Sequence, residues 1–193
     1  MKKNILCFLM SGLMLTFVSC GNKDGHEDST EIAEDQNEEK FDDSKVDEDA
    51  EFAVEAADGG LLEVQLGTLA LTKASSAQVK QFAQMMVDDH TKANNELKAL
   101  AQTKNISLPT VLGDDQQKRY DNLNEKTGQD FDKEYMDLMV KDHKDDIDAF
   151  EKEAENGKEA ELKSWAAGKL TALRHHLEVA ERTQEAAKEN KNQ

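Results

Sequence analysis

Cysteine is nearly absent from this chain, and its absence rules out several kinds of chemistry. The 193 residues include two cysteines, Cys7 and Cys20, both within the first twenty positions. If the N-terminal segment is removed and Cys20 is modified, no thiol remains. A disulfide, a thiolate metal site and a thiol nucleophile are then all excluded from the folded part of the chain.

Positive charge is also scarce. Lys and Arg number 24 against 41 Asp and Glu, which gives a formal net charge of -17. An acidic surface of this kind repels a phosphate backbone, so we expect no nucleic-acid partner. Beyond the first twenty residues, no apolar run approaches the ~18 residues of a membrane-spanning helix. The sequence from Gly21 onward is therefore predicted to contain no such helix.

The N-terminal segment has the layout of an export signal. Lys2 and Lys3 precede an apolar run over residues 5–18, which ends at Ser19 and Cys20. This ending resembles the lipobox of a bacterial lipoprotein signal, in which a peptidase cuts before the cysteine and lipid is attached to it. We predict a signal peptide at 1–19 and a bilayer anchor at Cys20, because a multiply acylated cysteine holds firmly. An ordinary secretory peptide or an uncleaved anchor helix are the alternatives.

The same resemblance carries an expectation about location. It implies a lipid-anchored protein of the cell envelope, and Gly21 after the cysteine favours the outer membrane, facing the periplasm or the cell surface. Residues 20–50 are predicted to be the lipidated cysteine and an acidic disordered linker. Residues 21–50 contain 13 acidic residues and three lysines, and such a segment repels itself and stays extended.

From residue 51 onward, apolar residues recur with helical spacing. Ser75 and Gln78 have the spacing of a capping box at the start of one of these helices. No stretch alternates as a strand does. The helices are predicted over the ranges 51–74, 76–104, 114–125, 130–155 and 159–188.

Four of these five helices are long, and each has one apolar face to bury. The expected fold is all-α: an antiparallel four-helix bundle over residues 51–188, with the short helix 114–125 in the crossover. Residues 189–193 are expected to be a polar tail.

Two of the predicted helices share a signature. An aromatic residue, a Met-Val pair and an Asp-His pair occur at residues 82–90 and again 53 residues later at 135–143. Helical spacing points His90 and His143 toward the core, and it does the same for His176 in the last helix. Glu63 lies on or beside the buried face of the first helix.

These four residues lie near the middle of their helices, and mid-helix positions share a level in an antiparallel bundle. Glu63, His90, His143 and His176 are therefore candidate metal ligands, and their donor atoms suit iron, zinc or copper. Asp89, Asp142 and Tyr135 are candidate hydrogen-bond partners of those ligands. The alternative is a structural polar core, in which Glu63 pairs with His90 or His143 and no metal is bound.

The chain resembles the bacterial family DUF4142 over about residues 52–184. The resemblance is carried by a set of short stretches: Glu63-Val64, Phe82-Ala83, Asp89-His90, Asp142-His143, Trp165-Ala166 and His176-Leu177. It implies a ferritin-like helical bundle of the cell envelope and says little about activity. Ferritin-like di-iron sites use Glu-x-x-His motifs. The positions three before the histidines are Val87, Val140 and Leu173, which cannot bind metal.

The sequence contains no complete set of catalytic residues. A nucleophile elbow, a phosphate-binding glycine loop and a zinc-protease motif are all missing. The first prediction is therefore a non-enzymatic envelope lipoprotein that acts as an interaction or stress-related module with an envelope protein partner. The alternative is a metal-binding or redox protein that uses the Glu/His cluster.

Overall fold

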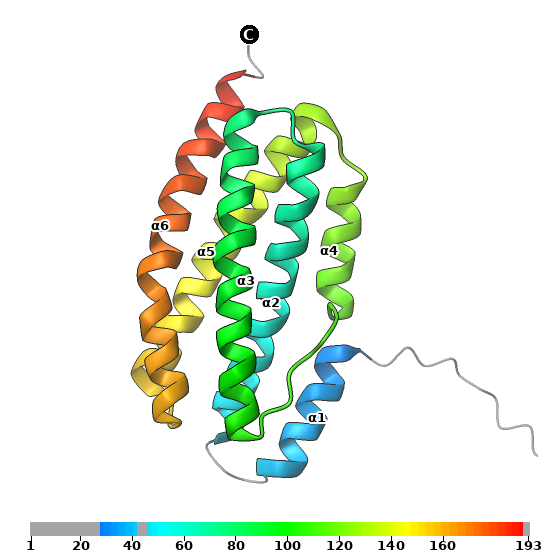
Figure 1. Ribbon diagram of the computed structural model, residues 1–193. Helices are drawn as coiled ribbons and strands as arrows, with labels where there is room; N and C mark the ends of the chain where they lie inside the picture. Colours follow the sequence, from blue (N-terminus) through cyan, green and yellow to red (C-terminus); the bar gives the residue numbers. More distant parts are fainter. Residues whose placement is uncertain (1–27, 42–45, 191–193) are drawn as a thin grey trace, which may run out of the picture.

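Every regular element that the structure describes is an α-helix. The computed structural model describes residues 28–41 and 46–190 (Figure 1). Its helices are α1 (Ser29–Phe41), α2 (Val46–Lys73), α3 (Ala77–Lys104), α4 (Asp114–Asn124), α5 (Gly128–Asn156) and α6 (Ala160–Asn190). The all-α class is confirmed within these ranges, and α3 to α6 end within two residues of their predicted bounds. None of the described helices is long and apolar enough to cross a membrane.

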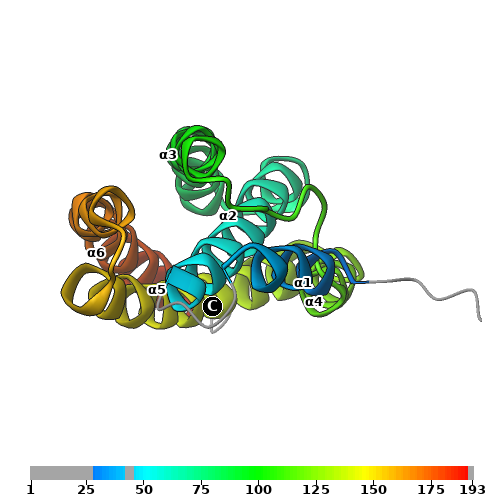
Figure 2. The same ribbon diagram turned by 90° about the horizontal axis from the view of Figure 1, so that it is seen from below.

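The four long helices lie side by side and form two hairpins, α2–α3 and α5–α6 (Figures 1 and 2). Helix α2 also packs against α5, and α3 against α6. In Figure 1, α2 and α6 run upward while α3 and α5 run downward, so every packed pair of long helices is antiparallel. The connection from α3 to α5 runs the length of the molecule and contains α4, the short helix expected there.

The buried side chains form two apolar clusters along these helices. One is built around Phe82, Tyr135 and Met139, and the other around Phe52 and Phe150. In the sequences of α3, α5 and α6, the histidines fall between the members of the two clusters. The fold therefore places a polar layer in the interior between two apolar ones.

The N-terminal acidic segment differs from its prediction. Residues 29–41 form α1, and α2 begins at Val46, so the expected disorder of 20–50 is wrong for those parts. Helix α1 is fastened to the crossover by a reciprocal pair of bonds. Asn37 Nδ2 donates to the Ser107 carbonyl at 2.9 Å, and Ser107 N donates to Asn37 Oδ1 at 2.7 Å. The predicted signal peptide, Cys20 and the tail from 191 lie outside the described residues.

The turn between α2 and α3 is held by a carboxylate from α5. Asp132 accepts hydrogen bonds from the backbone N–H groups of Ser75 at 2.9 Å and Ser76 at 2.8 Å. Ser76, rather than Ser75, is the N-cap residue of α3, and its side chain accepts from Val79 N. The predicted capping box is therefore wrong: the residue three after this N-cap is Val79, which has no side-chain acceptor, and the Ser75 hydroxyl bonds Asp132 instead.

We expect Asp132→Ala to lower the free energy of unfolding by about 1–3 kcal/mol, because two backbone donors lose a buried, charged acceptor. The measurement is urea denaturation. Asp148→Ala on the exposed side of α5 is the matched control, with an expected change within about 0.5 kcal/mol. Equal stabilities for the two variants would show that Asp132 does not secure this turn.

Candidate metal centre

Three histidines from three helices meet in the interior. His90 lies on α3, His143 on α5 and His176 on α6, and all three side chains are buried. Their ring centroids are 5.6 Å apart for His90 and His143, 5.3 Å for His90 and His176, and 5.4 Å for His143 and His176. The three rings thus form a nearly equilateral triangle, and helical spacing had predicted that each would face inward.

Each imidazole has one nitrogen that faces an oxygen. His143 Nδ1 donates to the Met139 carbonyl at 2.9 Å. His90 Nδ1 lies 2.6 Å from Glu63 Oε2, and His176 Nε2 lies 2.9 Å from Asp89 Oδ2. These contacts fix the orientation of every ring in the cluster.

The second nitrogen of each ring is buried and has no hydrogen-bond partner among the described residues. These atoms are His90 Nε2, His143 Nε2 and His176 Nδ1. One potential ligand nitrogen from each histidine lies within 4.8 Å of those of the other two. Buried polar atoms are nearly always paired, so three unpaired nitrogens in one place need an explanation.

Glu63 contacts two of the histidines from α2. Besides its short contact with His90, its Oε1 atom lies 3.5 Å from His143 Nδ1 and accepts no hydrogen bond from the described residues. Carboxylate oxygens of Glu63 and Asp146 also lie within 4.8 Å of a His143 nitrogen and of each other. Sequence reasoning missed Asp146, although it follows His143 by three positions and therefore shares its helix face.

Burial controls the protonation of the cluster. It raises the pKa of Glu63 well above its usual range, and the nearby Asp142 carboxylate adds to this effect. It lowers the pKa of His90 to about 4. Burial lowers the pKa of His143 to about 3, aided by repulsion from His90 and His176. At neutral pH, His90 and His143 are therefore uncharged.

The three predicted partner residues have different surroundings. Asp89 contacts His176, as described above. Asp142 is buried and forms an ion pair with Arg119 of α4 instead of contacting a histidine. Tyr135 is buried with its hydroxyl unpaired among the described residues, and its ring packs edge-on against Phe82. The repeated signature therefore gives two inward histidines but two differently used aspartates.

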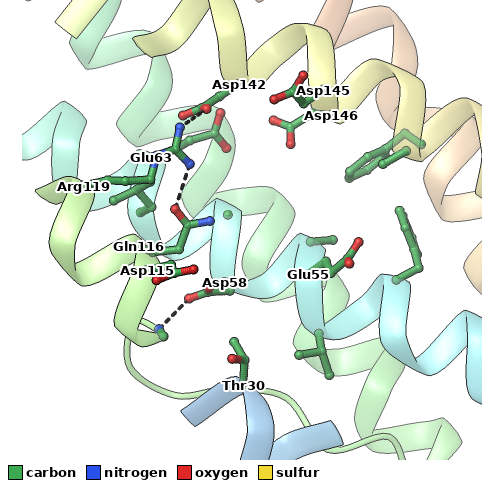
Figure 3. Close-up of a pocket in the computed structure, with 18 of the residues that line it drawn as sticks. Thr30, Glu55, Asp58, Glu63, Asp115, Gln116, Arg119, Asp142, Asp145 and Asp146 are labelled. Carbon is green, nitrogen blue, oxygen red and sulfur yellow. Dashed lines mark hydrogen bonds and ion pairs between the residues drawn. The ribbon is translucent and has the colours of Figure 1, made fainter. Parts of the chain in front are cut away.

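A cavity of about 460 Å³ lies beside Glu63 and is rich in carboxylates (Figure 3). In Figure 3, Arg119 reaches between Asp142 and Gln116, and Asp145 and Asp146 lie to the right of Asp142 on α5. Sequence reasoning missed this cavity, because its walls combine helices whose relative placement periodicity does not reveal. Its acidic residues are Asp28, Glu34, Glu55, Asp58, Glu63, Asp115, Asp142, Asp145 and Asp146.

The low pKa of His143 makes its contribution to stability depend on pH. In metal-free protein, the unfolded chain takes up a proton on His143 below about pH 6.5, whereas the folded protein does so near pH 3. The neutral His143 ring therefore makes its full contribution to the free energy of unfolding above about pH 6.5. As the pH falls below this value, that contribution decreases by about 1.4 kcal/mol per pH unit. We expect the stability difference between wild type and His143→Gln to fall by about 2 kcal/mol from pH 7 to pH 5.

Urea denaturation in the presence of a chelator measures this difference. The exposed His175 supplies the control variant His175→Gln, whose difference from wild type is expected to stay constant. If the stability difference between wild type and His143→Gln is also independent of pH, then His143 is protonated to the same extent in the folded and unfolded states.

Comparison with known proteins places the chain in a family without supplying an activity. No curated protein and no solved structure gives a match. A family match covers residues 33–183, which include α2 to α5, most of α1 and α6, and all the histidines of the cluster. The chain therefore belongs to DUF4142, a family defined by a domain of unknown function.

Proposed function

We propose that this domain binds a divalent transition-metal ion through His90 Nε2, His143 Nε2 and His176 Nδ1. The observation that carries the proposal is the state of the rings: one nitrogen of each faces an oxygen, and the other is buried and unpaired. Metal-binding histidines have this arrangement, in which an oxygen acceptor fixes the ring and its tautomer. Glu63 and Asp89 then orient His90 and His176, so Glu63 supports a ligand instead of being one.

The donor set favours a particular group of metals. Neutral imidazole nitrogens suit zinc, copper, iron and nickel, whereas calcium and magnesium prefer oxygen ligands. The acidic cavity beside Glu63 supplies a negative potential that attracts cations toward the cluster. A ferritin-like di-iron site is not part of the proposal, because Val87, Val140 and Leu173 occupy the positions three before the histidines.

The proposal includes the architecture around this site. The antiparallel pairings of α2, α3, α5 and α6, with a long crossover that contains α4, support a ferritin-like four-helix bundle. The histidines then occupy the bundle's middle layer, where facing helices commonly build metal sites.

The cellular setting is proposed from the N-terminal sequence alone. The lipobox-like ending at Cys20 supports a lipid anchor, and with it a place in the cell envelope. The sequence first suggested an interaction module with a structural histidine core. Three unpaired buried nitrogens are harder to reconcile with that role than with a metal site, because each costs free energy unless something binds it.

Metal binding by the full chain tests the proposal. The protein is purified in mild detergent without a polyhistidine tag, stripped with a chelator, and titrated with Zn²⁺ against a chromophoric competitor. We expect about one strongly bound ion per chain, and an affinity more than about 100-fold lower in the His90→Ala/His143→Ala variant. His175→Ala, which changes an exposed neighbour of His176, is the control and should bind like wild type. No strong binding, or equal binding by the double variant, would reject the site.

A further inference from the structure

The histidine cluster borders a second cavity, of about 160 Å³, which the three-histidine site leaves unused. His90 and His176 line it, and so does Glu63. Its other walls combine apolar side chains such as Phe150 and Trp165 with two lysines, Lys92 and Lys169, and two further carboxylates, Asp89 and Asp146. The rings of Phe150 and Trp165 pack together there, with centroids 5.4 Å apart.

Three protein ligands do not complete a metal's coordination. Structural zinc sites have four protein ligands, whereas sites with three keep the fourth position for water or another exogenous ligand. Glu63 and Asp89 contact the nitrogens of His90 and His176 that are not assigned to the metal. Asp146 groups with Glu63 and His143 instead of with all three histidines.

Resting on the metal site proposed above, we propose that the bound metal keeps an open coordination position facing this cavity and takes a small anion there. The volume of the cavity, about 160 Å³, favours a small ligand. Lys92 and Lys169 line the cavity; Lys169 Nζ forms an ion pair with Glu96 and lies 5.8 Å from the centroid of the Trp165 ring. Because the three imidazole ligands are neutral, the bound metal ion keeps its positive charge, and this charge attracts an anion.

Cobalt substitution and azide test this inference on the full chain in detergent. Co²⁺ bound by the histidines gives visible d–d absorption bands, and azide that coordinates the metal shifts them. Ala172 is exposed and lines the cavity, so Ala172→Trp should obstruct the opening without disturbing the core. Ala167→Trp, at an exposed position of α6 that does not line the cavity, is the matched control.

We expect azide to shift the bands of wild type and Ala167→Trp at similar concentrations, and Ala172→Trp to need about tenfold more. Cobalt bands that azide never changes would overturn the open position while leaving the metal site intact. An equal azide response in Ala172→Trp would overturn the assignment to this cavity. Failure of the wild type to bind Co²⁺ would reject the metal site itself.

Discussion

The metal-free Glu63→Met/His90→Leu variant is expected to be more stable than wild type by about 1–4 kcal/mol, and to have lost strong metal binding. Glu63 and His90 are both buried and lie 2.6 Å apart. Taking two ionisable groups out of water costs more than their contact returns in many proteins. Replacing such a pair with apolar residues of similar volume is then neutral or raises the stability by about 1–4 kcal/mol.

The two changes must be made together. Glu63→Met alone leaves His90 Nδ1 buried without its partner oxygen, and its Nε2 atom already has no partner among the described residues. A buried polar group that loses its partner costs about 1–3 kcal/mol, so we expect each single variant to be less stable than the double variant. If Glu63 and His90 destabilise the metal-free protein, then their presence is explained by function and not by the stability of the fold.

The wild type, the two single variants and the double variant form a double-mutant cycle. Urea denaturation of these four proteins in the presence of a chelator measures the coupling free energy between the two side chains. Arg174 and Glu151 provide a comparison, because they form an exposed ion pair and neither residue lines the two cavities beside the cluster. We expect a coupling below about 1 kcal/mol for that pair. A double variant of Glu63 and His90 that is less stable than wild type would show that the pair serves the fold.

Much of the fold follows from local sequence patterns. Apolar spacing identifies the long helices after residue 75 because each buries one face along most of its length, and capping and turn residues mark their ends. The same periodicity turns His90, His143 and His176 inward. Their similar depth follows from helices of similar length that pack antiparallel, so their meeting was predictable without knowing any contact.

The parts that were missed depend on contacts between distant segments. Helix α1 has little apolar character, and its attachment rests on Asn37 and Ser107, which are 70 positions apart. Asp142 was expected to be solvated or to support a ligand on a neighbouring helix, but it pairs with Arg119 because α4 packs on that side of α5. The role of Glu63 depends on which oxygen faces which nitrogen. Periodicity specifies a face and leaves these pairings open.

Zinc is expected to raise the free energy of unfolding of the wild-type protein by about 4 kcal/mol at a free concentration 1,000 times its dissociation constant. A ligand that binds only the folded state stabilises it in proportion to the logarithm of its concentration, so the gain should grow by about 1.4 kcal/mol per tenfold increase. The three ring nitrogens come from α3, α5 and α6, so they converge only in the folded chain.

Thermal unfolding at several zinc concentrations measures this dependence, and the His90→Ala/His143→Ala variant supplies the matched control. That variant keeps all 41 acidic residues, so zinc attracted by surface charge alone would shift both proteins equally. Calcium provides a second control, because it favours oxygen ligands and gains nothing from the histidines. A logarithmic gain confined to zinc and the wild-type protein would locate the stabilising ion at the histidine cluster. Equal shifts in both proteins would assign the effect to the acidic surface.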